Sequence, residues 1–106
     1  MREIKKEKIG ETLHRLAAEF VQKEAGKSSL ITITRVEMSP DGKRAIVYFT
    51  TLPDSEQETA EKFLKRKVPE FRHYVKEHSR IGIIPYMDFK IDFGERNRQR
   101  LDELSE

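Results

Sequence analysis

Apolar residues recur three and four positions apart in the N-terminal part of the chain. The members of this period are Ile9, Leu13, Leu16, Ala17, Phe20 and Val21. Such spacing places side chains on one face of an α-helix, and Gly26 can adopt the left-handed backbone that often ends one. The pattern predicts one amphipathic helix from Glu3 to Ala25.

The next part of the chain changes from helical to β character. Leu30–Met38 is rich in β-branched residues, and Arg44–Leu52 follows it after the turn sequence Ser39–Gly42. In that turn Pro40 presets φ and Gly42 accepts a positive φ. We therefore predict a β-hairpin.

The first strand of this hairpin does not keep one alternation along its length. Ile31 and Ile33 share one face of a regular strand, whereas Val36 and Met38 share the other. The apolar positions therefore change from odd to even residue numbers at residues 34–35. There we predict a β-bulge or a strong local twist.

A second helical period follows and is interrupted by a proline. Its members are Ala60, Phe63, Leu64 and Val68 and, after the interruption, Phe71, Tyr74, Val75 and His78. Ser55 and Glu58 have the spacing of a capping box at the start of this helix. Because Pro69 cannot donate the hydrogen bond of a continuing helix, a kink is predicted at Val68–Pro69 and two helices meet there at an angle.

The clearest strand lies near the C-terminus. Its apolar residues Met87, Phe89, Ile91 and Phe93 alternate with Asp88, Lys90 and Asp92. This alternation predicts a half-buried strand with one wet face. We expect the highly charged residues 95–106 to form a mobile tail or a frayed helix, so residues 1–94 make up the domain.

The predicted order is helix, strand, strand, helix, kink, helix, strand. Helices packed on one face of a three-stranded sheet give an α+β fold of two layers. A chain of 106 residues suits one such domain, in which nearly every strongly apolar residue serves the core.

Composition narrows the possible functions only slightly. Charged residues make up 38% of the chain, but the formal net charge is +2, so the placement of charge matters more than its total. The absence of cysteine excludes disulfides, thiolate metal sites and thiol nucleophiles. The chain has no apolar run that resembles a signal peptide or a membrane span, and we expect a cytoplasmic protein with no membrane partner.

Cations concentrate on the kinked pair of helices. They are Lys62, Lys65, Arg66, Lys67, Arg72, Lys76 and Arg80. Only Glu70 and Glu77 oppose them, so seven minus two leaves five positive charges in excess. Such a stripe can bind phosphates with salt-dependent, largely sequence-independent affinity. The same residues also fit the solvated face of an ordinary lysine-rich helix.

A second group of cations opens the first helix. It consists of Arg2, Lys5, Lys6 and Lys8. A second phosphate patch and ordinary surface lysines both fit these residues.

Two groups of segments carry a family resemblance. Val36–Asp41 and Ala45–Phe49 form one group, Ile84–Phe89 and Asp92 form the other, and Arg72 lies on the helix between them. In this order and spacing, the segments resemble the ribosome-binding factor A family over nearly the whole chain. The resemblance implies a type II KH-like domain with the order α-β-β-α-(kink)-α-β.

The resemblance also implies a function. It implies binding to the small (30S) ribosomal subunit and its 16S rRNA, and assistance in late maturation and rRNA processing without catalysis. The chain departs from the family pattern at the kink, where Lys67–Pro69 replaces an Ala-x-Gly element, and at Gly82, where an arginine often stands and where the nearest one here is Arg80. No Gly-x-x-Gly loop is present, so we expect folded RNA to be recognised by shape and charge.

The sequence gives little support for catalysis. His73 and His78 are five residues apart, which does not place two metal ligands on one helical face, and His14 stands alone. Asp88 and Asp92 share a strand face but lie about 13 Å apart, too far for a glycosidase pair, and we expect them on the wet face. We expect no enzyme activity, cofactor or metal.

We therefore predict a monomeric RNA-binding factor whose main RNA surface is the cationic helical pair. Two alternatives remain open. One is a protein-interaction module of the same fold that uses an exposed sheet edge. The other is a small enzyme, for which so thin a core leaves little room for a polar pocket.

Overall fold

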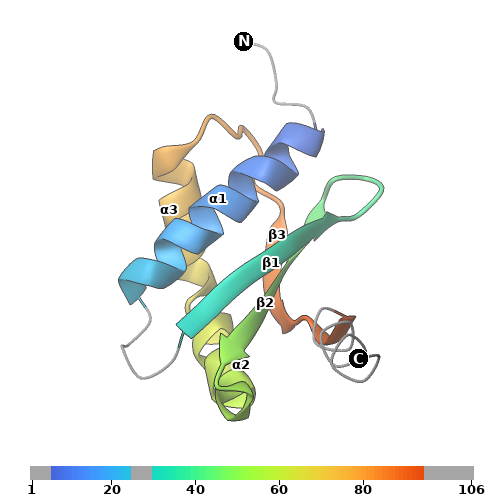
Figure 1. Cartoon of the computed structure of the whole chain (residues 1–106). Coiled ribbons are helices and arrows are strands. Elements are labelled where there is room, and N and C mark those ends of the chain that lie inside the picture. The colour runs from blue at the N-terminus through green and yellow to red at the C-terminus, as the bar shows by residue number, and fades with distance from the viewer. Residues whose placement is uncertain (1–5, 25–29, 95–106) are drawn as a thin grey trace.

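The computed structural model describes residues 6–24 and 30–94, which form helices and strands in the predicted order (Figure 1). The elements are α1 (Lys6–Glu24), β1 (Leu30–Met38), β2 (Arg44–Leu52), the 3-10 turn η1 (Asp54–Glu56), α2 (Gln57–Arg66), α3 (Val68–His78) and β3 (Tyr86–Ile91). The expected ends of the first helix at residues 3–5 and 25, and the tail at residues 95–106, lie outside the described residues.

The strands form one sheet in the order β1-β2-β3, with the helices on one of its faces (Figure 1). β1 pairs with β2 as an antiparallel hairpin, and β3 pairs with β2 in parallel. The predicted α+β, two-layer, type II KH-like fold is confirmed. Its second sheet face carries no helix among the described residues.

The irregularity predicted in β1 is confirmed as a break in register. Ile33 pairs with Phe49 and Arg35 with Tyr48, which leaves Thr34 as the extra residue. An inserted residue reverses the alternation of a strand. For this reason the apolar residues of β1 on both sides of the break pack against the same core.

The core lies between the helices and the sheet and is organised around aromatic rings. Phe71 of α3 is fully buried, with its ring centroid 5.2 Å from that of Phe20 and 5.5 Å from that of Phe89. Leu13 and Leu16 of α1 are also fully buried. One ring of α3 thus joins the first helix to the last strand.

The hairpin turn is closed by its own polar groups. The Ser39 amide donates to the Arg44 carbonyl at 2.9 Å, and the Ser39 hydroxyl donates to an oxygen of Asp41 at 2.6 Å. The Lys43 amide donates to the same oxygen at 2.9 Å, and Gly42 adopts a φ of +73°. The turn therefore depends on a carboxylate and on a glycine.

The same contacts shift the titration of the turn carboxylate. Hydrogen bonds from the Ser39 hydroxyl and the Lys43 amide lower the pKa of Asp41. A carboxyl group whose pKa is lower in the folded state than in the unfolded state stabilises the fold at any pH above its unfolded-state pKa. This contribution is lost as the pH falls through the lowered pKa.

We predict that Gly42→Ala lowers the free energy of unfolding by about 1 kcal/mol, because a Cβ strains a backbone with positive φ. Space is not the cause, since no neighbouring heavy atom would lie within 4 Å of that Cβ. Gly82→Ala is the matched control, because its Cβ would also meet nothing within 4 Å and Gly82 has no positive φ. Urea unfolding of both variants tests this, and equal losses would contradict it.

Three local predictions are wrong. The capping box at Ser55 does not form, because α2 follows η1 and the residue before it, Glu56, makes no capping hydrogen bond with its side chain. The helices separate at Lys67, slightly before the predicted Val68–Pro69, and Pro69 lies in the first turn of α3. An amide in the first turn has no partner within the helix, so a proline is tolerated there. Finally, β3 ends at Ile91 and Phe93 is 56% exposed.

Candidate nucleic-acid interface

Three of the predicted phosphate ligands lie on the outward face of α2. Ala60 and Leu64 of this helix are buried in the core. Helical spacing places Lys62, Lys65 and Arg66 away from that buried side and within three or four residues of each other. All three side chains are exposed. Three of the predicted cations are therefore grouped on one exposed face, and their role in RNA binding stays a prediction.

Two of the predicted lysines have acidic partners. Lys65 reaches Asp88 of β3 with an N–O distance of 3.1 Å, and Lys67 reaches Glu24 of α1 at 3.8 Å. The Lys65 side chain keeps 43% of its surface exposed, and ion pairs this exposed contribute little to stability. Lys65 can therefore exchange Asp88 for a phosphate. Lys67 instead points toward Glu24 of α1, so it is not counted with the cations of α2.

Arg72 makes contacts that the sequence did not indicate. Its side chain is half-buried and donates from Nη1 to the Pro85 carbonyl at 2.8 Å and from Nη2 to the Ile84 carbonyl at 3.5 Å. The guanidinium thus joins α3 to the segment before β3. Periodicity and charge could not show this use of the side chain.

Lys76 and Arg80 continue the cationic side beyond Arg72. Lys76 lies one helical turn after Arg72, and Arg80 lies just past the end of α3. Both are exposed, and within residues 6–24 and 30–94 neither forms an ion pair. The same holds for Lys62 and Arg66. These four residues and Lys65 are called the cationic surface below.

The cationic surface adjoins one strand. Lys65 of α2 contacts Asp88 within β3, and Arg72, one turn before Lys76 on α3, contacts Pro85 immediately before β3. In the described sheet β3 is an edge strand. Lys65 of α2 and Arg72 of α3 therefore both reach the edge of the domain that β3 forms.

The opposite flank of α3 is acidic. A groove of about 450 Å³ between α1 and α3 is lined by Phe20, Glu24, Pro69, Glu70, His73, Tyr74 and Glu77. These lining residues include three glutamates and neither a lysine nor an arginine. The acidic residues of α3, Glu70 and Glu77, thus line this groove, whereas Arg72 and Lys76 of the same helix do not.

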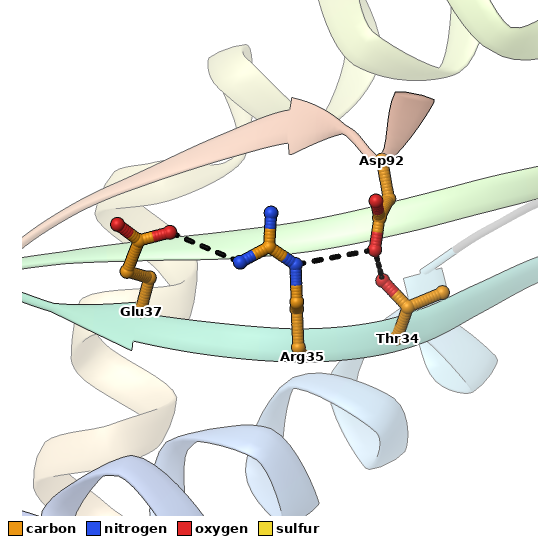
Figure 2. A network of polar contacts seen from close by, with 4 residues as sticks. All are labelled: Thr34, Arg35, Glu37 and Asp92. Atoms are coloured by element: carbon orange, nitrogen blue, oxygen red, sulfur yellow. Dashed lines mark hydrogen bonds and ion pairs between the residues drawn. The ribbon is translucent and has the colours of Figure 1, made fainter. Parts of the chain in front are cut away.

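The helix-free face of the sheet holds a polar network that the sequence did not reveal (Figure 2). Asp92, just after β3, is 2% exposed and accepts a hydrogen bond from the Thr34 hydroxyl at 2.6 Å. Arg35 lies 3.4 Å from the same Asp92 oxygen and donates to Glu37 at 3.0 Å. Asp92 therefore joins the end of β3 to the bulge of β1, and its predicted place on a wet face is wrong.

The arginine of this network also covers an aromatic ring. The guanidinium carbon of Arg35 lies 3.8 Å from the centroid of the Tyr48 ring. Partial desolvation lowers the pKa of Arg35, but the Glu37 hydrogen bond and the charge of Asp92 outweigh it and raise the pKa above its ordinary value. The bulge thus has a structural use, because it brings Thr34 and Arg35 to one carboxylate.

Asp92→Ala is expected to lower the free energy of unfolding by about 2 kcal/mol, since it removes a buried charged acceptor from the Thr34 hydroxyl. Glu37→Ala breaks only the exposed end of the network and should cost less than about 0.5 kcal/mol. Urea denaturation measures both changes. Equal losses for the two variants would show that Asp92 does not hold the bulge.

The second predicted cation patch is only partly described. Lys8 is exposed in the first turn of α1, and Lys6 is the first residue of that helix. Arg2 and Lys5 lie outside the described residues. This patch therefore stays a prediction.

The histidines have ordinary structural contacts. His73 lies 2.8 Å from Glu77, and the ring of His78 stacks on that of Tyr74 with centroids 4.0 Å apart. Within the described ranges, no three His, Asp or Glu side chains are grouped so that they could hold a metal ion. No described helix is long and apolar enough to cross a membrane.

Comparison with known proteins gives consistent matches. The family model for ribosome-binding factor A matches residues 5–105. Ribosome-binding factor A of Coxiella burnetii (strain Dugway) is 26% identical over 104 residues, which are 96% of this chain and 87% of that protein. The protein of the same name from Fervidobacterium nodosum is 36% identical over 77 residues, covering 72% of this chain and 62% of the relative.

Solved structures agree with these matches. The crystal structure of ribosome-binding factor A from Thermus thermophilus has a TM-score of 0.72 and 25% identity, and the match covers 83% of this chain and 97% of that one. A putative ribosome binding factor A from Thermotoga maritima, solved by NMR, shares the fold with a TM-score of 0.59 at 24% identity, over 80% of each chain. With the family model matching almost the entire sequence, this chain belongs to the ribosome-binding factor A family.

Proposed function

We propose that this protein binds the small (30S) ribosomal subunit through its 16S rRNA and assists late maturation and rRNA processing without catalysis. In this proposal residues 1–94 are the RNA-binding domain, and the protein acts as a monomer in the cytoplasm. Membership of the ribosome-binding factor A family supports an association with the ribosome. The subunit, the RNA and the stage of assembly are our inference.

The observation that carries the proposal is the one-sided distribution of charge across α3. On one side stand five exposed cations, Lys62, Lys65, Arg66, Lys76 and Arg80, four of them without an ion pair to any described residue. On the other side a groove is lined by three glutamates. A polyanion is attracted more strongly to the first side, although Lys67 pairs with Glu24 at the groove at 3.8 Å.

The geometry favours folded RNA over a single strand. KH domains that grip single strands bring the backbone of a Gly-x-x-Gly loop close to the nucleotides. Here the α2–α3 junction is formed by Arg66–Pro69, which contains no glycine to allow such a close approach. Binding should therefore rely on long side chains that reach phosphates along a structured particle.

Sedimentation of cell extract tests the proposal. On a sucrose gradient the tagged protein should travel with free small subunits and be depleted from assembled ribosomes. Deletion of its gene should leave 16S rRNA precursors in the free subunit peak. A protein that stays at the top of the gradient and leaves rRNA processing unchanged when deleted would contradict the proposal and favour a protein-interaction module.

A further inference from the structure

The segment between α3 and β3, residues 79–85, is held firmly at its start. The Ser79 hydroxyl donates to the Val75 carbonyl at 2.7 Å and accepts the Ile81 amide at 3.3 Å. The Ile81 side chain is 7% exposed and belongs to the core. The first half of this loop is therefore fixed by hydrogen bonds and by burial.

The end of the loop is also anchored, mainly by hydrogen bonds from Arg72. Arg72 donates to the carbonyls of Ile84 and Pro85, and Pro85 itself is buried. The next amide, that of Tyr86, donates to the Lys43 carbonyl of the hairpin at 2.9 Å. The backbone is thus anchored on both sides of Ile83 and at Tyr86.

This fixed segment carries the two most exposed large apolar side chains of the described residues. Ile83 is 87% exposed and Tyr86 is 77% exposed, whereas Leu30, Leu52 and Phe93 range from 56% to 70%. Single exposed apolar residues are common on protein surfaces. Here two lie three residues apart on a segment that is anchored on both sides, so little freedom is lost when a partner covers them.

The charges beside the loop indicate the chemistry of that partner. Arg80 lies within the loop and Lys76 in the last turn before it, and neither forms an ion pair with a described residue. Apolar or aromatic side chains flanked by cations suit RNA, whose phosphates bind the cations while exposed base faces cover the apolar groups.

Resting on the proposed function, we infer that Ile83 and Tyr86 contact nucleobases of the ribosomal RNA. Arg72 is then a positioning residue for this loop and not a phosphate ligand. The interface then has two parts. The cationic surface binds phosphates, and Ile83 and Tyr86 pack against exposed bases. The two parts differ in their response to salt, because only the phosphate contacts release counterions.

The test compares binding to purified small subunits and to 16S rRNA transcript across a series of salt concentrations. Ile83→Ser and Tyr86→Ser should each weaken binding by about tenfold at every salt concentration, without changing the slope of log K against log [salt]. Lys76→Gln or Arg80→Gln should instead reduce that slope by about one. Leu52→Ser, 70% exposed at the opposite end of β2 from the residue paired with Tyr86, is the matched control and should bind like the wild type.

Arg72→Lys separates positioning from phosphate binding. Lysine keeps the charge but cannot reproduce the paired bonds to Ile84 and Pro85. We expect a loss close to that of Ile83→Ser with the salt slope retained, and no further loss when the two changes are combined. If Arg72→Lys binds like the wild type, or if the two losses multiply, the positioning role is overturned.

The outcomes also distinguish a failure of the proposed function from a failure of the nucleobase contact. Wild-type protein that binds neither small subunits nor 16S rRNA would remove the proposed function itself. Wild-type binding that Ile83→Ser leaves unchanged would overturn the nucleobase contact alone. A loss seen with whole subunits but not with naked 16S rRNA would do the same, and would assign the loop to a ribosomal protein.

Discussion

Reversing two charges on the outward face of α2, Lys62→Glu with Arg66→Glu, should weaken binding to small subunits by about a hundredfold near 0.1 M salt. The two side chains are exposed, four residues apart, and unpaired with described residues. Their reversal removes two phosphate contacts and places two carboxylates against the same phosphates. Pelleting of the protein with purified subunits measures the change.

A second pair of charge reversals shows whether binding to the small subunit depends on the position of the cations or on the total charge of the protein. Arg15→Glu with Lys23→Glu changes the net charge by the same amount at two exposed residues of α1. Arg15 pairs with Glu19, and Lys23 lies over the ring of Tyr74, which lines the acidic groove. This pair should retain nearly wild-type binding. Equal losses for the two pairs would mean that only the overall charge attracts the protein to the particle.

Phe71→Ala should produce the largest loss of stability, about 3–5 kcal/mol in the free energy of unfolding. Phe71 is fully buried and its ring contacts those of Phe20 and Phe89, so alanine leaves a cavity at the junction of α1, α3 and β3. Because small domains are stable by only about 5–15 kcal/mol, a substantial unfolded population is expected at elevated temperature.

The comparison for this variant is an aromatic residue outside the core. Phe93 is 56% exposed, and Phe93→Ala should cost less than about 1 kcal/mol. Urea unfolding followed by circular dichroism gives both values. A loss for Phe71→Ala as small as that for Phe93→Ala would contradict the assigned core.

The elements of the fold could be predicted because each has a local signal. The parity slip in β1 indicated the bulge at residues 34–35, and the alternation from Met87 onward indicated β3. Pro69 indicated an interruption between two helices, although its position in the first turn of α3 was missed. Periodicity and backbone chemistry act over a few residues, so the sequence alone reveals them.

The candidate site could be predicted only in part, because its contacts join distant segments. Charge density identified Lys62, Lys65 and Arg66 as part of a cationic cluster, and these three lie on one exposed face of α2, while RNA binding by them stays a prediction. It could not show that Arg72 bonds carbonyls thirteen and twelve residues away, or that Asp92 lies against a residue fifty-eight positions earlier. Such partners depend on how the sheet and helices pack, which periodicity does not encode.

The exposed loop was missed for a related reason. An isoleucine such as Ile83 carries a strong expectation of burial, and nothing in its neighbours marks it as an exception. Its exposure follows from anchors on both sides, the buried Ile81 and Pro85, which leave the residues between them outside the core.

The salt dependence of wild-type binding to purified small subunits tests the central claim most directly. If the five cations of the cationic surface contact phosphates, log K should fall linearly with log [salt] with a slope of about −4.5, from roughly 0.9 per contact. A slope near zero, with binding equally tight at low and high salt, would contradict an interface built on phosphate contacts.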